Sequence, residues 1–250
     1  MPPLRCGADK VLAASYCRSK MGRLRKSHKR WVRSATEADT ASALIKCGST
    51  VFTLDPAAIF DRDAPLEVEI GAGRGDFILS RAAAYPDRNQ LANELSSAVT
   101  RILALRVARS SLFNVRVVQA DARSIVNLLL PDRCVSVFHV YFPDPWPKDR
   151  HAKHRLFSSF FVANLARTIR PDGILYFATD VLDYARRILE LLDSQGFVAQ
   201  AQSAPGASRS NFAKKFALEG RSLFSAGFAL APARLAESAS ARPSPAGPTH

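Results

Sequence analysis

The chain has 250 residues, a formal net charge of +13 and a pI near 10.1, and 47% of its residues are hydrophobic. This length suits one large α/β domain with tails, and the hydrophobic content is sufficient for a substantial core. No apolar run approaches the roughly 20 residues of a membrane-spanning helix, so we expect no membrane contact. The cysteines, Cys6, Cys17, Cys47 and Cys134, lack the spacing of a zinc site or a disulfide framework, which predicts a reducing compartment and no bound metal.

The positive charge is concentrated at the amino terminus. Residues 1–33 contain ten Lys or Arg and one acid, Asp9, so they carry +9 of the +13. Blocks of like charge usually stay disordered and act as interaction arms, and the excess of positive charge indicates a polyanionic partner such as RNA. Three other interpretations remain open: a solvated tail, an organelle transit peptide, and a true start at Met21. We therefore expect a basic, disordered arm at 1–50, a folded domain at 51–230 and a disordered tail at 231–250.

From Asp61 onward, β-prone and helical segments alternate, which predicts a parallel sheet with helices on both faces. The expected strands are 66–70, 89–94, 115–119, 134–141, 174–178, 197–201 and 223–230. The expected helices lie near 75–85, 97–110, 123–129 and 155–169, followed by one that Asp183 caps and Gly196 closes. Within 155–169, Phe160 belongs to the side expected to face the core, and Pro171-Asp172-Gly173 is expected to form a turn.

The first candidate site is a glycine-rich loop after the strand at 66–70. Gly71, Gly73 and Gly75 follow Glu69-Ile70 and precede a predicted helix. Glycines let the backbone turn tightly and approach a ligand closely. Dinucleotide-binding proteins need Gly-x-Gly-x-x-Gly, so the spacing here disfavours an NAD-dependent oxidoreductase. Taken alone, the loop is also compatible with a simple turn.

Four carboxylates lie in or just after predicted strands, at Glu69, Glu94, Asp121 and Asp144. The carboxyl ends of parallel strands meet at one edge of a sheet, where open α/β sheets bind ligands. Glu94 ends its strand, where an acid that holds ribose hydroxyls belongs. A group of acids would repel a pyrophosphate and favour a cationic nucleoside such as S-adenosylmethionine.

The second candidate site is the run Tyr141-Phe142-Pro143-Asp144-Pro145-Trp146-Pro147-Lys148. Its three prolines end the apolar strand at 134–141 and stiffen the loop that follows. The loop presents a carboxylate (Asp144), a flat aromatic (Trp146) and a cation (Lys148) at the carboxyl end of a strand. The alternative is a proline-rich surface turn with a packed tryptophan.

Together these motifs resemble the tRNA (guanine-N7)-methyltransferase family. The resemblance runs from about Phe60 to Phe228 and is carried by Glu69 to Gly75, Glu94, Asp121, Phe142 to Lys148 and Ala178-Thr179-Asp180. The proline run is close to diagnostic, whereas the glycine loop indicates only some methyltransferase. The resemblance implies a Rossmann-like class I methyltransferase fold, an α/β architecture whose seven-stranded, mostly parallel sheet has an antiparallel last strand and helices on both faces.

The resemblance also implies a role for each site residue. Cofactor-binding residues would be Glu69, Gly71 and Gly73 at the methionine end of S-adenosylmethionine, Glu94 at its ribose, Asp121 at its adenine and Asp144 near its sulfonium. Asp144 would also be the catalytic residue, as an acceptor that orients guanine, because guanine N7 has a lone pair and no proton to remove. Lys148, Asp180 and Ser210 would bind the substrate; the alternative for Asp180 is a helix cap at the end of a strand. The basic loop at 148–155 is a plausible track for RNA phosphates, or an ordinary solvated charge cluster.

Two departures from the family pattern affect the site. Ser210 keeps the hydroxyl of the family's Thr-x-x-Glu segment, but Ala213 replaces its glutamate, and Ala92 stands where a glycine is usual. The expected function within the resemblance is methyl transfer from S-adenosylmethionine to N7 of a guanosine in tRNA, at the variable loop, in the cytoplasm. The Ala213 departure favours an alternative, a catalytically weak RNA-binding protein on a methyltransferase scaffold. The sequence does not distinguish a monomer from a homodimer.

Overall fold

The structure, a computed structural model, describes residues 40–45, 53–146, 150, 154–205 and 222–232. Its strands are β1 (Leu44–Ile45), β2 (Leu66–Ile70), β3 (Asn89–Glu94), β4 (Val115–Gln119), β5 (Val135–Tyr141), β6 (Ile169–Thr179), β7 (Phe197–Gln200) and β8 (Phe224–Leu230). Its helices are α3 (Pro56–Phe60), α4 (Asp76–Ala84), α5 (Ser97–Arg109), α6 (Ala122–Ser124), the π-helical turn η2 (Ile125–Leu129), α7 (Ser159–Thr168) and α8 (Leu182–Ser194).

The strands form one mostly parallel sheet in the order β1-β4-β3-β2-β5-β6-β8-β7. The last strand, β8, pairs antiparallel with both β6 and β7, whereas the other pairs are parallel. The seven expected strands are all present, and the antiparallel last strand is confirmed. The eighth, β1, is a two-residue addition that pairs Leu44 with Val117 and comes from the segment that the sequence assigns to the arm.

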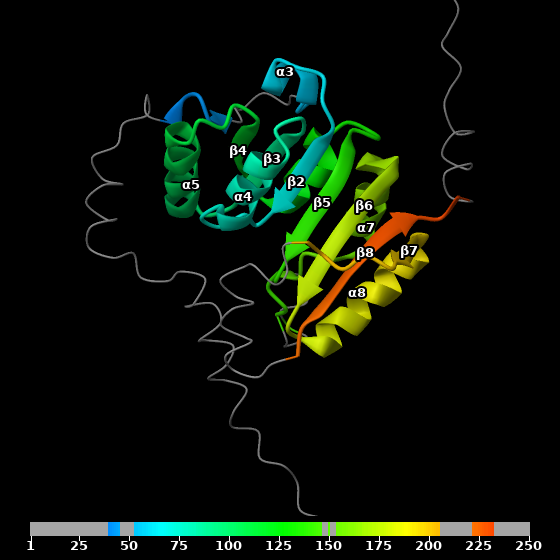
Figure 1. The fold of residues 1–250 in the computed structure, drawn as a ribbon. Coiled ribbons are helices and arrows are strands. Elements are labelled where there is room, and N and C mark those ends of the chain that lie inside the picture. Colours follow the sequence, from blue (N-terminus) through cyan, green and yellow to red (C-terminus); the bar gives the residue numbers. More distant parts are fainter. Residues whose placement is uncertain (1–39, 46–52, 147–149, 151–153, 206–221, 233–250) are drawn as a thin grey trace, which may run out of the picture.

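Helices cover both faces of the sheet (Figure 1). On one face, α4 and α5 pack against β3 and β4 through small and branched side chains such as Ala82, Leu103 and Val117. On the other face, η2, α7 and α8 pack against β5 and β6. This arrangement is the three-layer architecture that the alternation of strands and helices predicts.

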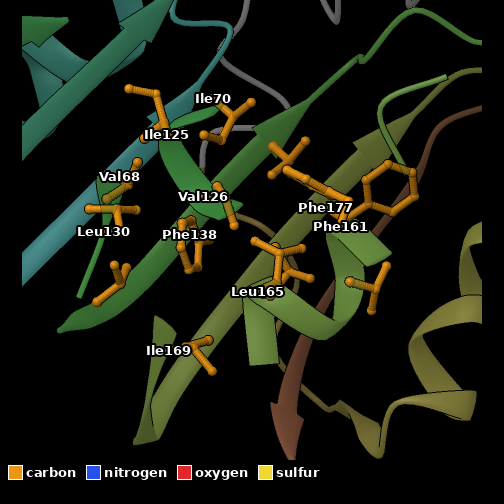
Figure 2. Packing of buried hydrophobic residues seen from close by; sticks show 14 of the residues in the cluster. Val68, Ile70, Ile125, Val126, Leu130, Phe138, Phe161, Leu165, Ile169 and Phe177 are labelled. Atoms are coloured by element: carbon orange, nitrogen blue, oxygen red, sulfur yellow. The ribbon is translucent and has the colours of Figure 1, made fainter. Parts of the chain in front are cut away.

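The main core lies between the sheet and η2, α7 and α8. Figure 2 shows Val68, Phe138 and Phe177 from neighbouring strands in contact with side chains of η2 and α7. All five residues of β2 are buried, as expected for a central parallel strand covered on both faces. Full burial of each large side chain contributes about 1.5–3 kcal/mol, so the interleaved strands and helices hold the carboxyl edge of the sheet rigid.

The first turns of α7 and α8 differ from the sequence-based expectation. Helix α7 begins at Ser159 because the Oγ of Ser158 accepts a hydrogen bond from the Phe161 backbone N–H at 3.2 Å. The side chain of Phe160 is consequently 66% exposed, so its expected place in the core is wrong. Asp183 does not cap α8: the helix begins at Leu182, with Val181 at the N-cap position, so Asp183 lies within its first turn.

The expected turn at 171–173 is instead a bulge within β6. Ile169 pairs with Val135, and the ladder resumes with Ile174 opposite Val137, so the intervening residues loop out. Gly173 permits this crossing, since a Cβ there would lie 2.6 Å from the Ile169 side chain and 3.0 Å from the Ser136 carbonyl oxygen. The expected helix at 123–129 is also divided, into α6 and η2. None of the helices described by the structure combines the length and apolar character needed to cross a membrane.

Candidate active site

The candidate residues meet where the chain order reverses in the sheet. Strand β2 lies between β3, the next strand in sequence, and β5, the third strand after β2 in sequence. Loops at the carboxyl ends of two such strands diverge to opposite faces and leave a crevice in which open α/β sheets bind ligands. The glycine loop follows β2, and the proline loop, here residues 142–146, follows β5.

All three glycines of the loop after β2 have positive φ values, 74° at Gly71, 58° at Gly73 and 81° at Gly75. A Cβ at Gly75 would come within 2.2 Å of the Leu103 side chain, so this glycine allows α4 and α5 to approach. At Gly71 and Gly73, a Cβ would meet nothing within 4 Å. The first two glycines therefore border open space, as expected for a loop that approaches a ligand.

Glu69 places a buried carboxyl group beside this space. The residue is 5% exposed, and its Oε2 has no hydrogen-bond partner among the residues that the structure describes. Burial raises its pKa well above the usual value, and the negative charges of Asp76 and Glu94 raise it further. A buried acceptor of this kind suits a cationic donor, which would pair with the oxygen and favour the ionised form.

Glu94 ends β3, as expected, and its carboxylate makes two hydrogen bonds within the protein. Its Oε2 accepts a hydrogen bond from the Gly73 backbone N–H at 3.0 Å, and its Oε1 accepts one from the Ser96 N–H at 2.9 Å. The carboxylate thus joins the glycine loop to the start of α5. Each oxygen retains lone-pair capacity, which a ribose hydroxyl could use.

Asp121 lies two residues beyond β4 and is exposed. Its Oδ1 accepts a hydrogen bond from the Arg123 N–H at 2.7 Å, which makes Asp121 the N-cap of α6. A neighbouring residue missed by the sequence analysis is Asn93, which is buried and donates to the Ala120 carbonyl at 2.8 Å. This bond ties the end of β3 to the end of β4, so Glu94 and Asp121 are held at one edge.

The proline loop carries a strained backbone. Phe142 and Trp146 have φ values of 52° and 39°, a region that non-glycine residues rarely adopt. The Phe142 side chain is buried against Ala178, whose carbonyl accepts the Phe142 N–H at 2.8 Å. Asp144 lies in the loop between Phe142 and Trp146. It is half-buried and three residues beyond the end of β5.

Two further residues flank the proline loop. Asp180 is 8% exposed and directly follows β6; Val181, not Asp180, is the N-cap of α8, so the alternative of a helix cap is wrong. The second is Tyr184, a buried residue of α8 whose hydroxyl is close enough to Asp144 to be affected by its charge. Burial raises the pKa of Tyr184 to about 12, and the Asp144 charge adds to the shift, so the hydroxyl stays neutral.

Some expected site residues lie outside the part of the chain that the structure describes. These are Lys148 in the proline run, and Ser210 with Ala213 in the segment that departs from the family pattern. Of the basic loop, Arg150 and His154 are described and exposed, and the Trp146 and His154 rings lie 5.3 Å apart. Within the described ranges, no group of His, Cys, Asp and Glu could hold a metal ion.

The side chains and backbone at this edge of the sheet fit S-adenosylmethionine. A buried unpartnered carboxyl oxygen (Glu69), a loop bordered by open space and an acid at the end of a strand (Glu94) lie at the same edge of the sheet. The groups described there are mainly acceptors, which suits a ligand that carries a sulfonium and an ammonium. A pyrophosphate would instead be repelled by them.

Comparison with known proteins agrees with this geometry. Residues 63–224 match a family model described as a putative methyltransferase. The fold is similar to a solved antibiotic-related methyltransferase, with a TM-score of 0.56, 15% identity and coverage of 75% of this chain and 97% of that one. At that identity, the likeness concerns the fold alone.

Curated relatives extend the comparison to sequence. The chain is 37% identical over 184 residues to a tRNA (guanine-N(7)-)-methyltransferase of Paracidovorax citrulli, covering 70% of this chain and 74% of the relative. It is 42% identical over 142 residues to a protein of the same name from Nitrosospira multiformis, covering 57% of this chain. That second match spans 62% of the relative, less than two thirds of its length. The family model and these relatives, together with the site geometry, show that the chain belongs to the tRNA (guanine-N7)-methyltransferase family.

Proposed function

We propose that this protein transfers a methyl group from S-adenosylmethionine to N7 of a guanosine in tRNA, at the variable loop. The observation that carries the proposal is the buried Glu69 carboxyl, with an unpartnered oxygen beside the open glycine loop and across the switch point from the proline loop. The names of the relatives support the tRNA substrate and the N7 position. Since the reaction needs tRNA, we place it in the cytoplasm.

The cofactor supplies an electrophilic methyl group on a sulfonium. Glu69 would accept hydrogen bonds from the ammonium at the methionine end, and Gly71 and Gly73 would let the backbone approach it closely. Glu94 would hold the ribose hydroxyls while it keeps the loop in place through Gly73. Asp121 would accept a hydrogen bond from the adenine amine. It would use a carboxylate lone pair that the capping bond from the Arg123 N–H does not occupy.

Guanine N7 attacks through a lone pair and has no proton to lose, so the protein needs no general base. Its main task is to hold N7 in line with the methyl group, and orientation of this kind supplies most of the rate. Asp144 would orient the guanine as an acceptor, with Asp180 facing the same nucleoside from the end of β6. Lys148 and Ser210 complete the proposed substrate contacts, with Lys148 at a phosphate or at the O6 edge beside N7.

The test is incubation of the full chain with transcribed tRNA and methyl-labelled cofactor, followed by nucleoside analysis. We expect labelled 7-methylguanosine, which disappears from a matched transcript whose variable-loop guanosine is replaced by adenosine. Asp144→Asn should lower turnover while the melting temperature stays unchanged. Label in another nucleoside would refute the assignment, and tRNA binding without label would favour the RNA-binding alternative.

A further inference from the structure

Two arginines outside the motifs that carry the family resemblance, Arg123 and Arg155, connect the end of β4 with the proline loop. Arg155 donates from Nε to the Trp146 carbonyl oxygen at 3.1 Å. Arg123 donates from Nη2 to the Arg155 carbonyl oxygen at 3.2 Å. Both contacts are partly buried, so solvent screens them less than an exposed hydrogen bond.

The first of these bonds acts on a strained residue. Trp146 has a φ of 39°, and non-glycine residues stay in such conformations only when the surrounding structure fixes them. Arg155 holds the carbonyl of that residue, two positions from Asp144. At the other end of the loop, Phe142 is fixed by its bond to Ala178 and by burial. The conformation of Asp144 is thus determined from both sides.

The second bond connects Arg155 to the end of β4. The Arg123 backbone N–H is held by Asp121 at 2.7 Å, and its guanidinium reaches Arg155. An unbroken series of hydrogen bonds therefore runs from Asp121 through Arg123 and Arg155 to Trp146. Asp121 and Trp146 follow β4 and β5, which are separated in the sheet by β3 and β2.

We propose that Arg155 and Arg123 are positioning residues, which hold the proline loop in the conformation that places Asp144 for methyl transfer. This inference rests on the proposed function, because it assigns Asp144 to the guanine. Neither arginine needs to touch the substrate for this role. Loss of Arg155 would remove this hydrogen bond to the Trp146 carbonyl and let the loop relax toward an ordinary backbone conformation.

The variants are Arg155→Met, Arg155→Lys and Arg123→Met. The matched control is Arg167→Met, because Arg167 also binds backbone carbonyls, those of Leu130 at 3.2 Å and Val126 at 2.9 Å. Arg167 lies in the last turn of α7, and its backbone carbonyl accepts a hydrogen bond from the Arg133 N–H just before β5, so it lies at the opposite edge of the sheet. All four variants are compared by melting temperature so that activity is scored only for folded protein.

We expect Arg155→Met to lower kcat by roughly 10- to 100-fold with little change in KM for the cofactor, since a misplacement of about 1 Å can cost ~100-fold in rate. Arg123→Met should show a smaller fall, and Arg155→Lys a partial rescue. In an Asp144→Asn background, Arg155→Met should add little further loss, because both changes act on the same group. Arg167→Met should lower the melting temperature and leave kcat unchanged.

A second readout does not depend on activity. The chain has two tryptophans, Trp31 and Trp146, so Trp31→Phe makes Trp146 the single fluorescent reporter. We expect Arg155→Met to shift the Trp146 emission and increase its quenching by acrylamide, with no such change in Arg167→Met. An unchanged Trp146 signal, or a changed signal in an active enzyme with normal kcat, would overturn the inference. If no variant, including the parent chain, methylates tRNA, the proposed function fails and the positioning role falls with it, whereas fluorescence still reports whether Arg155 holds the loop.

Discussion

Glu69 is a carboxyl group whose surroundings oppose its ionisation. Burial raises its pKa well above the usual 4.5, and the charges of Asp76 and Glu94 act in the same direction. When the folded-state pKa of an acid is raised, the folded protein binds more protons than the unfolded chain between the two pKa values. The free energy of unfolding therefore decreases as the pH rises through that window, and ionised Glu69 destabilises the cofactor-free protein.

Replacing Glu69 with Gln should remove this penalty. We expect Glu69→Gln to increase the free energy of unfolding of the cofactor-free protein near neutral pH, while cofactor binding weakens by roughly 1.5–3 kcal/mol through loss of a charged acceptor. Urea denaturation and calorimetry measure the two effects. Wild-type cofactor affinity should also rise with pH until Glu69 is ionised, since a cationic ligand prefers the carboxylate. A less stable variant at pH 8, or one with unchanged affinity, would contradict this interpretation.

At the scale of a single strand, β2 carries two acids with opposite behaviour. Glu67 and Glu69 point to the same face and both are buried. Glu67, however, accepts hydrogen bonds from Arg81 at 2.7 Å and 2.9 Å and from Arg88 at 2.8 Å. Burial opposes its ionisation, but the hydrogen bonds from His139 and Arg81 outweigh burial and lower its pKa. One acid is therefore satisfied by the fold, whereas an oxygen of the other, Oε2 of Glu69, has no hydrogen-bond partner among the described residues.

His139 connects this ion cluster with the end of β5. Burial lowers the pKa of His139, so its ring is neutral. Its Nε2 lies 3.1 Å from the Glu67 carboxylate, which can only accept, so Nε2 carries the proton. Its Nδ1 then accepts the Tyr141 hydroxyl hydrogen at 2.9 Å. The network fixes Tyr141, the residue directly before the proline loop.

Glu67→Gln should destabilise the protein by about 3 kcal/mol, because the change leaves two partly buried arginines without their counter-charge. The sign of the pH effect is opposite to that of Glu69. A lowered folded-state pKa gives stability that is present above the unfolded value near 4.5 and is lost as the pH falls below it. Denaturation curves from pH 3 to 8 should thus converge for wild type and variant at low pH. Parallel curves, or a loss of cofactor affinity in the folded variant, would show that Glu67 has another role.

The strands were predictable from sequence, but several helix starts and contacts were not. The apolar run at 134–141 identified β5, as expected for a strand covered on both faces, and the alternation of β-prone and helical segments identified the other strands. Asp183 is a good capping residue, yet Val181 occupies the cap position, since packing of Tyr184 and Ile188 sets where α8 begins. Local preference was overridden by tertiary contacts there.

At the site, residue types were predictable and their partners were not. Glu94 was identified from its place at the end of a strand, but its bond to Gly73 depends on the register between β2 and β3. Asn93 gave no signal, although it ties two strand ends together. Arg155 stood in the sequence as one of several charges in a basic loop. Only the fold shows that it binds the carbonyl of a residue nine positions away.

At the scale of the whole molecule, charge and chemistry are separated along the chain. The first 33 residues carry +9 of the net +13, whereas the acids proposed to bind the cofactor begin at Glu69. Deleting residues 1–33 should weaken tRNA binding and flatten its salt dependence. Four phosphate contacts would contribute about −3 to the slope of log affinity against log salt, at roughly −0.7 per contact for single strands.

The measurement is tRNA affinity at several salt concentrations for the full and shortened chains, with cofactor affinity as the control. Cofactor affinity and turnover at saturating tRNA should not change. If log affinity plotted against log salt concentration has the same slope and the same values for both chains, residues 1–33 have no role in tRNA binding. Loss of cofactor binding would show that the segment is required by the folded domain.

The place of β8 in the sheet has a consequence for how the protein is made. This strand is the last in sequence, yet it lies between β6 and β7 and forms hydrogen-bonded ladders with both. Until residues 224–230 have left the ribosome, β7 has no neighbouring strand and β6 exposes the edge beside Asp180. A free strand edge invites pairing with other chains, so the nascent protein is most exposed to aggregation during this interval. The edge of β6 beside Asp180 is thus completed only near the end of synthesis, after the glycine loop has been made.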